Sequence, residues 1–304
     1  MAAELRVYRR RIRSVASTKK ITRAMELIAA SRIRRAQQRV ATTKPYITEI
    51  TRAVSAVTSN TTVKHPLTVE HDEPKRAAVL VVTSDRGFAG AYNSSILRTA
   101  DKLTALLHRR GMAVSHYLVG RKGINFYSFR DRPMAGQWQG FSERPTYAHA
   151  KEIGDVLIDA FAADAHDDDS GVDEIHVVYT EFVSLGVQRP HVTRVLPLEV
   201  EESEEEPEGG PFPLYEFEPS AEEVLDVLVP RYVESRVYNA LLQAAASEQA
   251  ARQRAMKSAT DNADDLIRSL NRLANAARQA GITQEISEIV GGADAMASAA
   301  SVND

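Results

Sequence analysis

The sequence predicts an α/β protein in which two long terminal helices form an antiparallel coiled coil around a central domain with a mainly parallel sheet. Near both ends of the 304-residue chain, apolar residues recur at alternating steps of three and four, which is the period of a coiled coil. Between these ends, apolar runs of strand length alternate with helical stretches, a pattern typical of α/β domains.

The C-terminal stretch from about Tyr232 to Val290 contains no proline and is predicted to form one helix about 85 Å long. A helix of this length must pack on another long helix or project into a partner. Gln249 and Arg252 fall in its apolar register, so the seam is polar for about one heptad. The expected seam consists of Met256, Ala259, Ala263, Leu266, Leu270, Leu273 and Ala277, with Tyr238, Leu242 and Ala245 upstream.

Residues 3 to about 58 are predicted to form the second long helix, which Pro45 should kink or interrupt. Its stripe begins with Leu5, Tyr8, Ile12 and Val15 and is expected to continue, after a shift of phase at residues 18–20, through Ile21, Met25, Ile28, Ile33, Ala36 and Val40. The alternative is two independent amphipathic helices on a core. The length of both stripes favours the coiled coil, because ordinary helices run to roughly 8–20 residues.

The central part predicts a Rossmann-like α/β domain with a mainly parallel sheet. Residues 77–83 form an apolar run typical of a strand buried on both faces. A turn containing Gly87 and Gly90 follows, and then a helix that Asn93 or Ser94 could cap and Gly111 would end. Further strands are expected at 114–119, 175–180, 188–198 and 212–217, and a helix at 147–163.

We divide the chain into an N-terminal coiled-coil helix (1–58), a connector (59–75), a globular α/β domain (76–218) and a C-terminal coiled-coil helix (219–304). Ser220 and Glu223 have the spacing of a capping box at the start of the last element. Pro230 would allow a short first helix before the long one.

Composition limits the possible chemistry. The chain has no cysteine, which excludes disulfides, thiolate catalysis and cysteine-bound metals. Neither a signal peptide nor an apolar run of about 18 residues is evident, so membrane contact is expected only through a partner. Residues 1–44 carry thirteen Lys and Arg but only Glu4 and Glu26 as acids, which indicates an acidic partner.

The candidate sites for chemistry are weak. Gly87 and Gly90 follow a strand, where a nucleotide could bind, but the three-glycine fingerprint and the phosphate-loop lysine are missing. His166, Asp167, Asp168 and Asp169 could suggest a metal site, although their spacing does not fit an EF-hand and a solvated loop is favoured. The basic N-terminal helix has few aromatic residues for stacking on nucleic acid. The residues therefore indicate a shaft with a globular base and no active site.

Three motifs connect the chain with a known family. They are residues 12–31, the turn at 84–93, and residues 255–263 together with 278–293. Through them the chain resembles, over nearly its whole length, the gamma subunit of bacterial F-type ATP synthases.

This resemblance implies a rotor shaft without catalytic residues or a cofactor of its own. The coiled coil would enter a ring of three alpha and three beta subunits, and the α/β domain would lie with the epsilon subunit on the membrane c-ring. Rotation would couple proton flow to ATP synthesis and regulate ATPase activity. The complex would lie at the cell membrane, peripheral and on the cytoplasmic side, without nucleic acid or membrane insertion by this chain. The alternative from another class is an independent nucleotide-binding α/β enzyme with a coiled-coil appendage.

The resemblance also implies contact residues. Met25 and Arg23 would meet an acidic lever loop of beta, near Asp85, Arg86 and Gly87. Arg278 and Gln279 would hydrogen-bond a loop of the empty beta subunit, and an apolar tip would turn in a collar. The tip residues are Ile282, Ile286, Ile289 and Val290. Gly281 is expected to interrupt the last helix, and the acidic loop at His166, Asp167, Asp168 and Asp169 is a hypothetical regulatory contact with the c-ring or epsilon.

Overall fold

The computed structural model describes residues 2–60, 73–163, 170–198, 218 and 220–300. The chain divides into two compact units, of which unit 1 comprises Met1–Ile28 and Arg254–Asp304 and unit 2 comprises Ala29–Gln253. Two long helices, α1 (Ala2–Asn60) and α5 (Ala221–Ala300), contribute residues to both units. The predicted strand at 212–217 lies outside the described residues.

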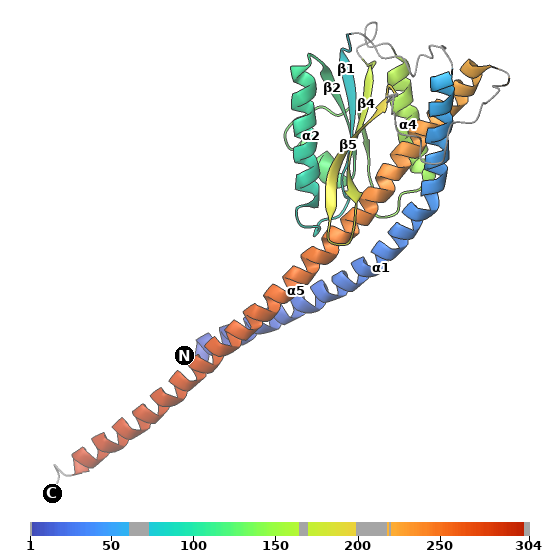
Figure 1. Cartoon of the computed structure of the whole chain (residues 1–304). Coiled ribbons are helices and arrows are strands. Elements are labelled where there is room, and N and C mark those ends of the chain that lie inside the picture. Colours follow the sequence, from blue (N-terminus) through green and yellow to red (C-terminus); the bar gives the residue numbers. More distant parts are fainter. Residues whose placement is uncertain (1, 61–72, 164–169, 199–217, 219, 301–304) are drawn as a thin grey trace. The chain divides into compact units, whose positions relative to one another are not determined.

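Unit 2 contains a five-stranded sheet in the order β3-β2-β1-β4-β5 (Figure 1). Its strands are β1 (Arg76–Val82), β2 (Ala113–Val119), β3 (Gly136–Trp138), β4 (Glu174–Phe182) and β5 (Gln188–Leu196). The pairs β1–β2, β1–β4 and β2–β3 are parallel, and β5 is antiparallel to β4. The predicted mainly parallel sheet is confirmed.

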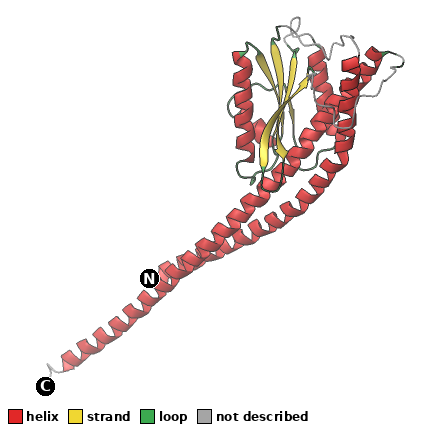
Figure 2. Cartoon of the chain, viewed as in Figure 1, coloured by secondary structure: helices red, strands yellow, loops and turns green. Residues whose placement is uncertain are grey.

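Helices cover both faces of this sheet (Figures 1 and 2). Ala77, Val79 and Val81 pack with α2 (Tyr92–Arg109) and α3 (Arg121–Ser128) on one side. Leu80 and Val82 face the other side, which α4 (Tyr147–Ala162) and the unit 2 parts of α1 and α5 cover. Because both faces are covered, every position of β1 after Arg76 is buried, which explains its uninterrupted apolar sequence.

The start of α2 differs from the expected capped helix. The N-cap position is Ala91, and no side chain caps the helix there. Asn93 instead accepts a hydrogen bond from the Ser84 amide at 3.0 Å, so its side chain closes the preceding turn. Gly111 ends α2 as predicted, with a φ of 85° that glycine adopts without strain. The sequence reading missed α3 and β3, which are only eight and three residues long.

Both prolines of the long helices lie inside continuous helix, so an interruption at Pro45 and a separate short helix before Pro230 are wrong, while a kink at Pro45 stays a prediction. Pro45 lies within α1 and Pro230 within α5. A proline removes one backbone bond and strains the preceding turn. Apolar burial next to each proline offsets this cost: Ile47 and Ile50 are buried after Pro45, and Val229 and Val233 are buried on either side of Pro230. The amide of Glu223 lies 3.2 Å from the Ser220 hydroxyl, as the predicted cap requires.

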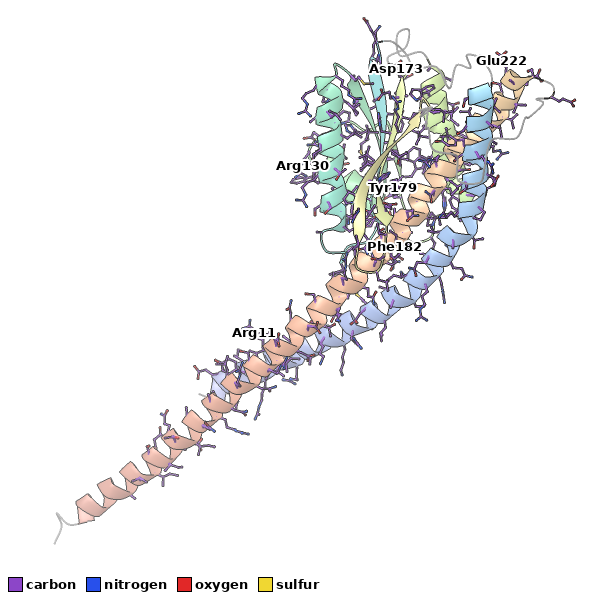
Figure 3. All side chains as sticks on the ribbon, viewed as in Figure 1. Arg11, Arg130, Asp173, Tyr179, Phe182 and Glu222 are labelled. Carbon is purple, nitrogen blue, oxygen red and sulfur yellow. The ribbon has the colours of Figure 1, made fainter. Side chains whose placement is uncertain are left out.

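In unit 2, α5 is buried on nearly all sides from Ala240 to Arg252. The Ser247 hydroxyl donates to the Thr180 carbonyl at 3.0 Å, and the Phe182 amide donates to the Gln243 side chain at 3.1 Å. Figure 3 shows Tyr179 and Phe182 on β4, the strand that makes these contacts. Ser247 and Gln243 are therefore paired with β4, which offsets the cost of placing polar side chains in this packed stretch.

Unit 1 is an antiparallel pair of helices formed by the N-terminal part of α1 and the C-terminal part of α5. Lys19 pairs with Asp264, and the hydroxyls of Thr22 and Thr260 lie 2.8 Å apart. Residue numbers therefore rise along one helix as they fall along the other. The antiparallel coiled coil predicted from the two stripes is confirmed here.

The predicted register of α1 is wrong at Ile21 and Ile28, whereas Ile33 is buried and Ala36 and Val40 are partly buried, as predicted. The seam keeps an unbroken alternation of three and four steps through Lys19, Thr22 and Glu26, while Ile21 and Ile28 are exposed. No shift of phase occurs at residues 18–20. Polar side chains are tolerated in the seam because partners on α5 or on α1 itself satisfy them, as in the Lys19–Asp264 and Arg23–Glu26 pairs.

The predicted seam of α5 is half correct. Met256, Ala263 and Leu270 are buried, and Ala277 is partly buried. The intervening positions are displaced by one residue, so that the seam uses Thr260, Ile267 and Ala274 in place of Ala259, Leu266 and Leu273. Leu266 and Leu273 are 39% and 47% exposed.

Gly281 does not interrupt α5, which continues as a helix to Ala300. The expected break is wrong, although glycine in a helix interior still costs about 1 kcal/mol relative to alanine. Residues 282–293 are all exposed. Among the described residues, this last part of unit 1 is therefore a single helix.

Candidate functional site

The turn after β1 is held rigidly at the carboxyl edge of the parallel strands. The Asp85 carboxylate accepts hydrogen bonds from the amides of Arg121 and Ser142 at 3.1 and 2.9 Å. The Asp85 amide donates to the Ser142 hydroxyl at 2.9 Å. Burial opposes ionisation of Asp85, but the backbone donors of Gly140, Ser142 and Arg121 outweigh it and lower the pKa of the carboxyl.

The same edge is where nucleotides bind in doubly wound folds, with a phosphate at a helix N-terminus. Here the Asp85 carboxylate already accepts the first amide of α3. Next to it, the Thr83 hydroxyl accepts the Gly123 amide at 2.9 Å. A Cβ added at Gly120 would come within 2.3 Å of the Thr83 carbonyl oxygen. The protein's own groups fill the position of a phosphate, which argues against the nucleotide-binding alternative.

A cluster of charged side chains connects this turn with both long helices inside unit 2. We call it the Glu143 cluster; its members are Arg32, Arg86, Glu143, Glu248 and Arg252. Glu143 accepts from Arg32 at 2.6 Å and from Arg252 at 3.2 Å, and Arg86 lies 3.6 Å away. Arg252 also donates to the Gly87 carbonyl at 3.3 Å. The predicted contact residues Arg86 and Gly87 therefore belong to one ion network with α1 and α5.

Sequence reasoning missed Glu143, Arg32 and Glu248 as members of this network. One signal was present, because Gln249 and Arg252 occupy apolar register positions and are buried. A buried arginine requires acidic or carbonyl partners. Glu248 lies one turn earlier on α5, but Glu143 and the Gly87 carbonyl come from segments more than 100 residues away in the sequence, so the pattern of α5 by itself does not identify those two partners.

A cavity of about 160 Å³ lies beside the Glu143 cluster in unit 2, and its rim is basic. Arg32, Arg35 and Arg39 line it from one face of α1, and Arg144 lines it from the loop after β3. Arg35, Arg39 and Arg144 are exposed. Part of the basic character predicted for residues 1–44 is thus concentrated on one surface, which suits acidic side chains of a partner.

In unit 1, the predicted contact residues lie at two levels of the coiled coil. One guanidinium nitrogen of Arg23 donates to both carboxylate oxygens of Glu26 at 2.9 Å, and Met25 is half-buried. Arg278 and Gln279 are exposed, and Arg278 lines a shallow groove with Leu5 and Glu285. Thr22 faces Thr260, so about 18 residues of α5, or roughly 27 Å, separate Arg278 from the level of Thr22. The structure does not bring the two sets together.

The predicted apolar tip is exposed on the single-helix part of α5. Ile282, Ile286, Ile289 and Val290 are 50–72% exposed, and their spacing places them along one side of a helix. Basic side chains project from the coiled coil as well, such as Arg11 of α1 in Figure 3. The predicted regulatory loop at His166, Asp167, Asp168 and Asp169 lies outside the described residues.

The described residues contain neither a helix suited to span a membrane nor a cluster of metal-binding side chains. None of their helices combines the length and apolar character needed to cross a membrane. No group of three or more His, Asp or Glu side chains within the described ranges is arranged to hold a metal ion.

The fold and these surfaces define a class of protein: an antiparallel coiled-coil shaft whose helices continue into an α/β domain, with charged and apolar surfaces suited to protein partners. A protein-family model described as ATP synthase matches residues 4–296. The chain belongs to the gamma-chain family of ATP synthase.

Curated relatives match over nearly their whole length. The chain is 66% identical to the ATP synthase gamma chain of Acidothermus cellulolyticus, covering 97% of this chain and 98% of the relative. It is 63% identical to that of Kineococcus radiotolerans, with 99% of each chain covered. Among solved structures, a chain of the Euglena gracilis mitochondrial ATP synthase (OSCP/F1/c-ring) matches with a TM-score of 0.66 and 15% identity, covering 97% of this chain and 95% of that one. At this identity the match shows the fold.

Proposed function

We infer that this chain is the central rotor shaft of a proton-driven ATP synthase. The observation that carries this inference is the match of residues 4–296 to the ATP synthase family together with the antiparallel coiled coil of unit 1. The chain is a non-catalytic subunit, and the ATP-forming residues lie in its partners. Rotation of the shaft couples proton flow to ATP synthesis and, in reverse, ATP hydrolysis to rotation.

Each surface of the chain has a proposed partner. Three alpha and three beta subunits surround the coiled coil, while epsilon and the c-ring contact the α/β domain. The complex is peripheral to the cell membrane on its cytoplasmic side. The arginines of α1 meet an acidic lever loop of beta at Arg23 and Met25, with Asp85, Arg86 and Gly87 nearby, because opposite charges attract at long range without requiring one fixed geometry.

The end of α5 has two proposed roles. Arg278 and Gln279 hydrogen-bond a loop of the empty beta subunit, where a guanidinium suits a carboxylate. The exposed apolar tip, Ile282 to Val290, turns within an apolar collar, because nonpolar contacts are not directional and hold no single angle. The acidic loop at 166–169 remains a hypothetical regulatory contact with the c-ring or epsilon.

The proposed role of Arg278 is tested in a complex assembled from this chain with its alpha and beta subunits. Arg278→Ala should lower the rate of ATP hydrolysis by about tenfold, the effect of losing one charge-assisted hydrogen bond. Arg272→Ala is the matched control, since Arg272 is also exposed on α5. Equal rates for both variants and wild type would contradict the role of Arg278.

A further inference from the structure

Arg252 is the central residue of the Glu143 cluster and holds three segments of unit 2 together. Its guanidinium donates to Glu143 at 3.2 Å, to Glu248 at 2.6 Å and to the Gly87 carbonyl at 3.3 and 3.4 Å. Two of these acceptors, Glu143 and Gly87, lie on loops outside α5. The third, Glu248, lies one turn earlier on the same helix.

Glu248 is the most deeply buried acid of the cluster, with 1% of its side chain exposed. Burial raises the pKa of Glu248 to about 7, although the Arg252 charge opposes the shift; the Glu143 charge adds to it and Ser142 lowers it. Tyr92 also faces Glu248 across the packed turn, and burial keeps the pKa of Tyr92 far above its usual range. Arg32 and Arg86 approach from the other side of Glu143.

We propose that Glu248 controls, by gaining or losing a proton, how tightly Arg252 binds the 84–93 turn and Glu143. When Glu248 is ionised, its carboxylate competes within α5 for the Arg252 guanidinium. When Glu248 is neutral, that competition falls, and Arg252 binds Glu143 and the Gly87 carbonyl more strongly. The turn is then held more firmly to α5.

The direction of the pH dependence follows from linkage. An acid whose pKa is raised on folding binds its proton more tightly in the folded state than in the unfolded one. Its stabilising contribution is complete below the unfolded value of about 4.5 and is lost as the pH rises through about 7. The contacts of the 84–93 turn are therefore expected to weaken between pH 6 and pH 8.5.

This proposal goes beyond the rotor role and does not depend on it. It concerns contacts within unit 2, which exist whether or not the chain rotates in a complex. Residues 85–87 are also predicted to contact a partner subunit. In an assembled rotor, protonation of Glu248 would therefore make the binding of this turn to α5 depend on the pH of the surrounding solution.

The test is hydrogen exchange of the backbone amides of residues 86–93 in the full-length chain, measured at pH 6 and pH 8.5 and corrected for the intrinsic pH dependence of exchange. Wild type should lose protection by about tenfold at the higher pH. Glu248→Gln, which resembles the neutral acid, should stay protected at both values. Glu143→Gln should exchange faster than wild type at both values, because Arg252 then loses its charged partner on the loop.

The control is Glu49→Gln, which changes an exposed acid on α1 and should behave as wild type. Protection in wild type that does not change with pH overturns the proposal, whatever the variants do. A pH response in Glu248→Gln as large as that of wild type also overturns it, since another group would then titrate. Loss of rotation in a complex has no bearing on either outcome.

Discussion

Single glycines and carboxylates decide the local geometry of the α/β domain. Gly120 has a φ of 94°, and the space where a Cβ would stand lies within 2.3 Å of the Thr83 carbonyl oxygen. Gly140 has a similar φ of 100° but open space around it. Substitution of either glycine would strain the backbone, but only substitution of Gly120 would also cause steric overlap. Comparing the two positions therefore distinguishes the two costs.

We predict that Gly120→Ala lowers the free energy of unfolding of the full chain by about 3 kcal/mol or more, because the β1–α3 contact must open. Gly140→Ala should cost about 1–2 kcal/mol, from backbone strain by itself. Denaturant unfolding followed by circular dichroism measures both. Equal losses of unfolding free energy in the two variants would contradict this, because the overlap with Thr83 would then add nothing to the cost at Gly120.

Asp85 stabilises the domain as a carboxylate, and this gives a second prediction at the residue scale. Asp85→Asn should lower the free energy of unfolding by about 1–3 kcal/mol at neutral pH, the range for hydrogen bonds to a charged group. Because the pKa of Asp85 is lowered in the folded protein, its contribution is present above the unfolded value and lost as the pH falls through the folded one.

The difference in stability between wild type and Asp85→Asn should accordingly shrink as the pH falls below about 4. Asp159→Asn, on the exposed side of α4, is the matched control and should change stability by less than about 0.5 kcal/mol. A difference that stays constant from neutral to acidic pH would mean that the Asp85 side chain acts through its shape and not its charge.

The long helices show what sequence patterns can and cannot predict. The existence of α1 and α5 followed from the 3.5-residue period, and their antiparallel pairing followed from the globular domain between them. The length of α5 was underestimated, because it is one helix of 80 residues and not a long helix from about Tyr232 to Val290. The exact seam could not be predicted, because hydrophobicity favours Leu266 and Leu273, whereas in the structure Thr260 and Ala274 are buried and Ile267 is partly buried. The Thr260 hydroxyl donates to the Met256 carbonyl of α5 at 2.9 Å and also pairs across the seam with Thr22, 238 residues earlier in the chain. The sequence of one helix does not contain that information.

The same limit explains why the Glu143 cluster was not predicted from the sequence. Arg252 stood out as a charge in an apolar register, but its acceptors Glu143 and Gly87 approach from loops whose positions depend on the whole sheet. The two prolines were misjudged for a related reason, since the predicted local cost of Pro45 and Pro230 took no account of the packing on either side. Long-range packing decided each of these cases.

The corrected seam of α5 leads to a prediction at the scale of the element. Leu270 is 3% exposed and Leu273 is 47% exposed. Leu270→Ala should therefore destabilise the coiled coil of unit 1 by about 2–4 kcal/mol, and Leu273→Ala by less than about 1 kcal/mol. Hydrogen exchange of residues 260–275 in the full chain reports the local loss. A larger effect at Leu273 than at Leu270 would restore the register first predicted from hydrophobicity.

At the scale of the whole molecule, the chain combines one stable domain with surfaces that a chain in isolation does not cover. Leu266, Leu273 and the tip residues of α5 are exposed apolar side chains, and arginines line the cavity beside Glu143. Exposed apolar residues gathered along one element mark surfaces for protein partners. These features fit a subunit that functions inside a complex, which is the central claim of this account.

The most direct test of that claim is single-molecule rotation in a complex reconstituted with the alpha and beta subunits fixed to glass. The chain has no cysteine, so Ala105→Cys, on the exposed side of α2, provides one thiol for attaching a bead. On addition of ATP, the rotor account predicts stepwise turning in one direction. A complex that hydrolyses ATP at the normal rate while the bead remains still would show that this chain is a static stalk, and would contradict the account.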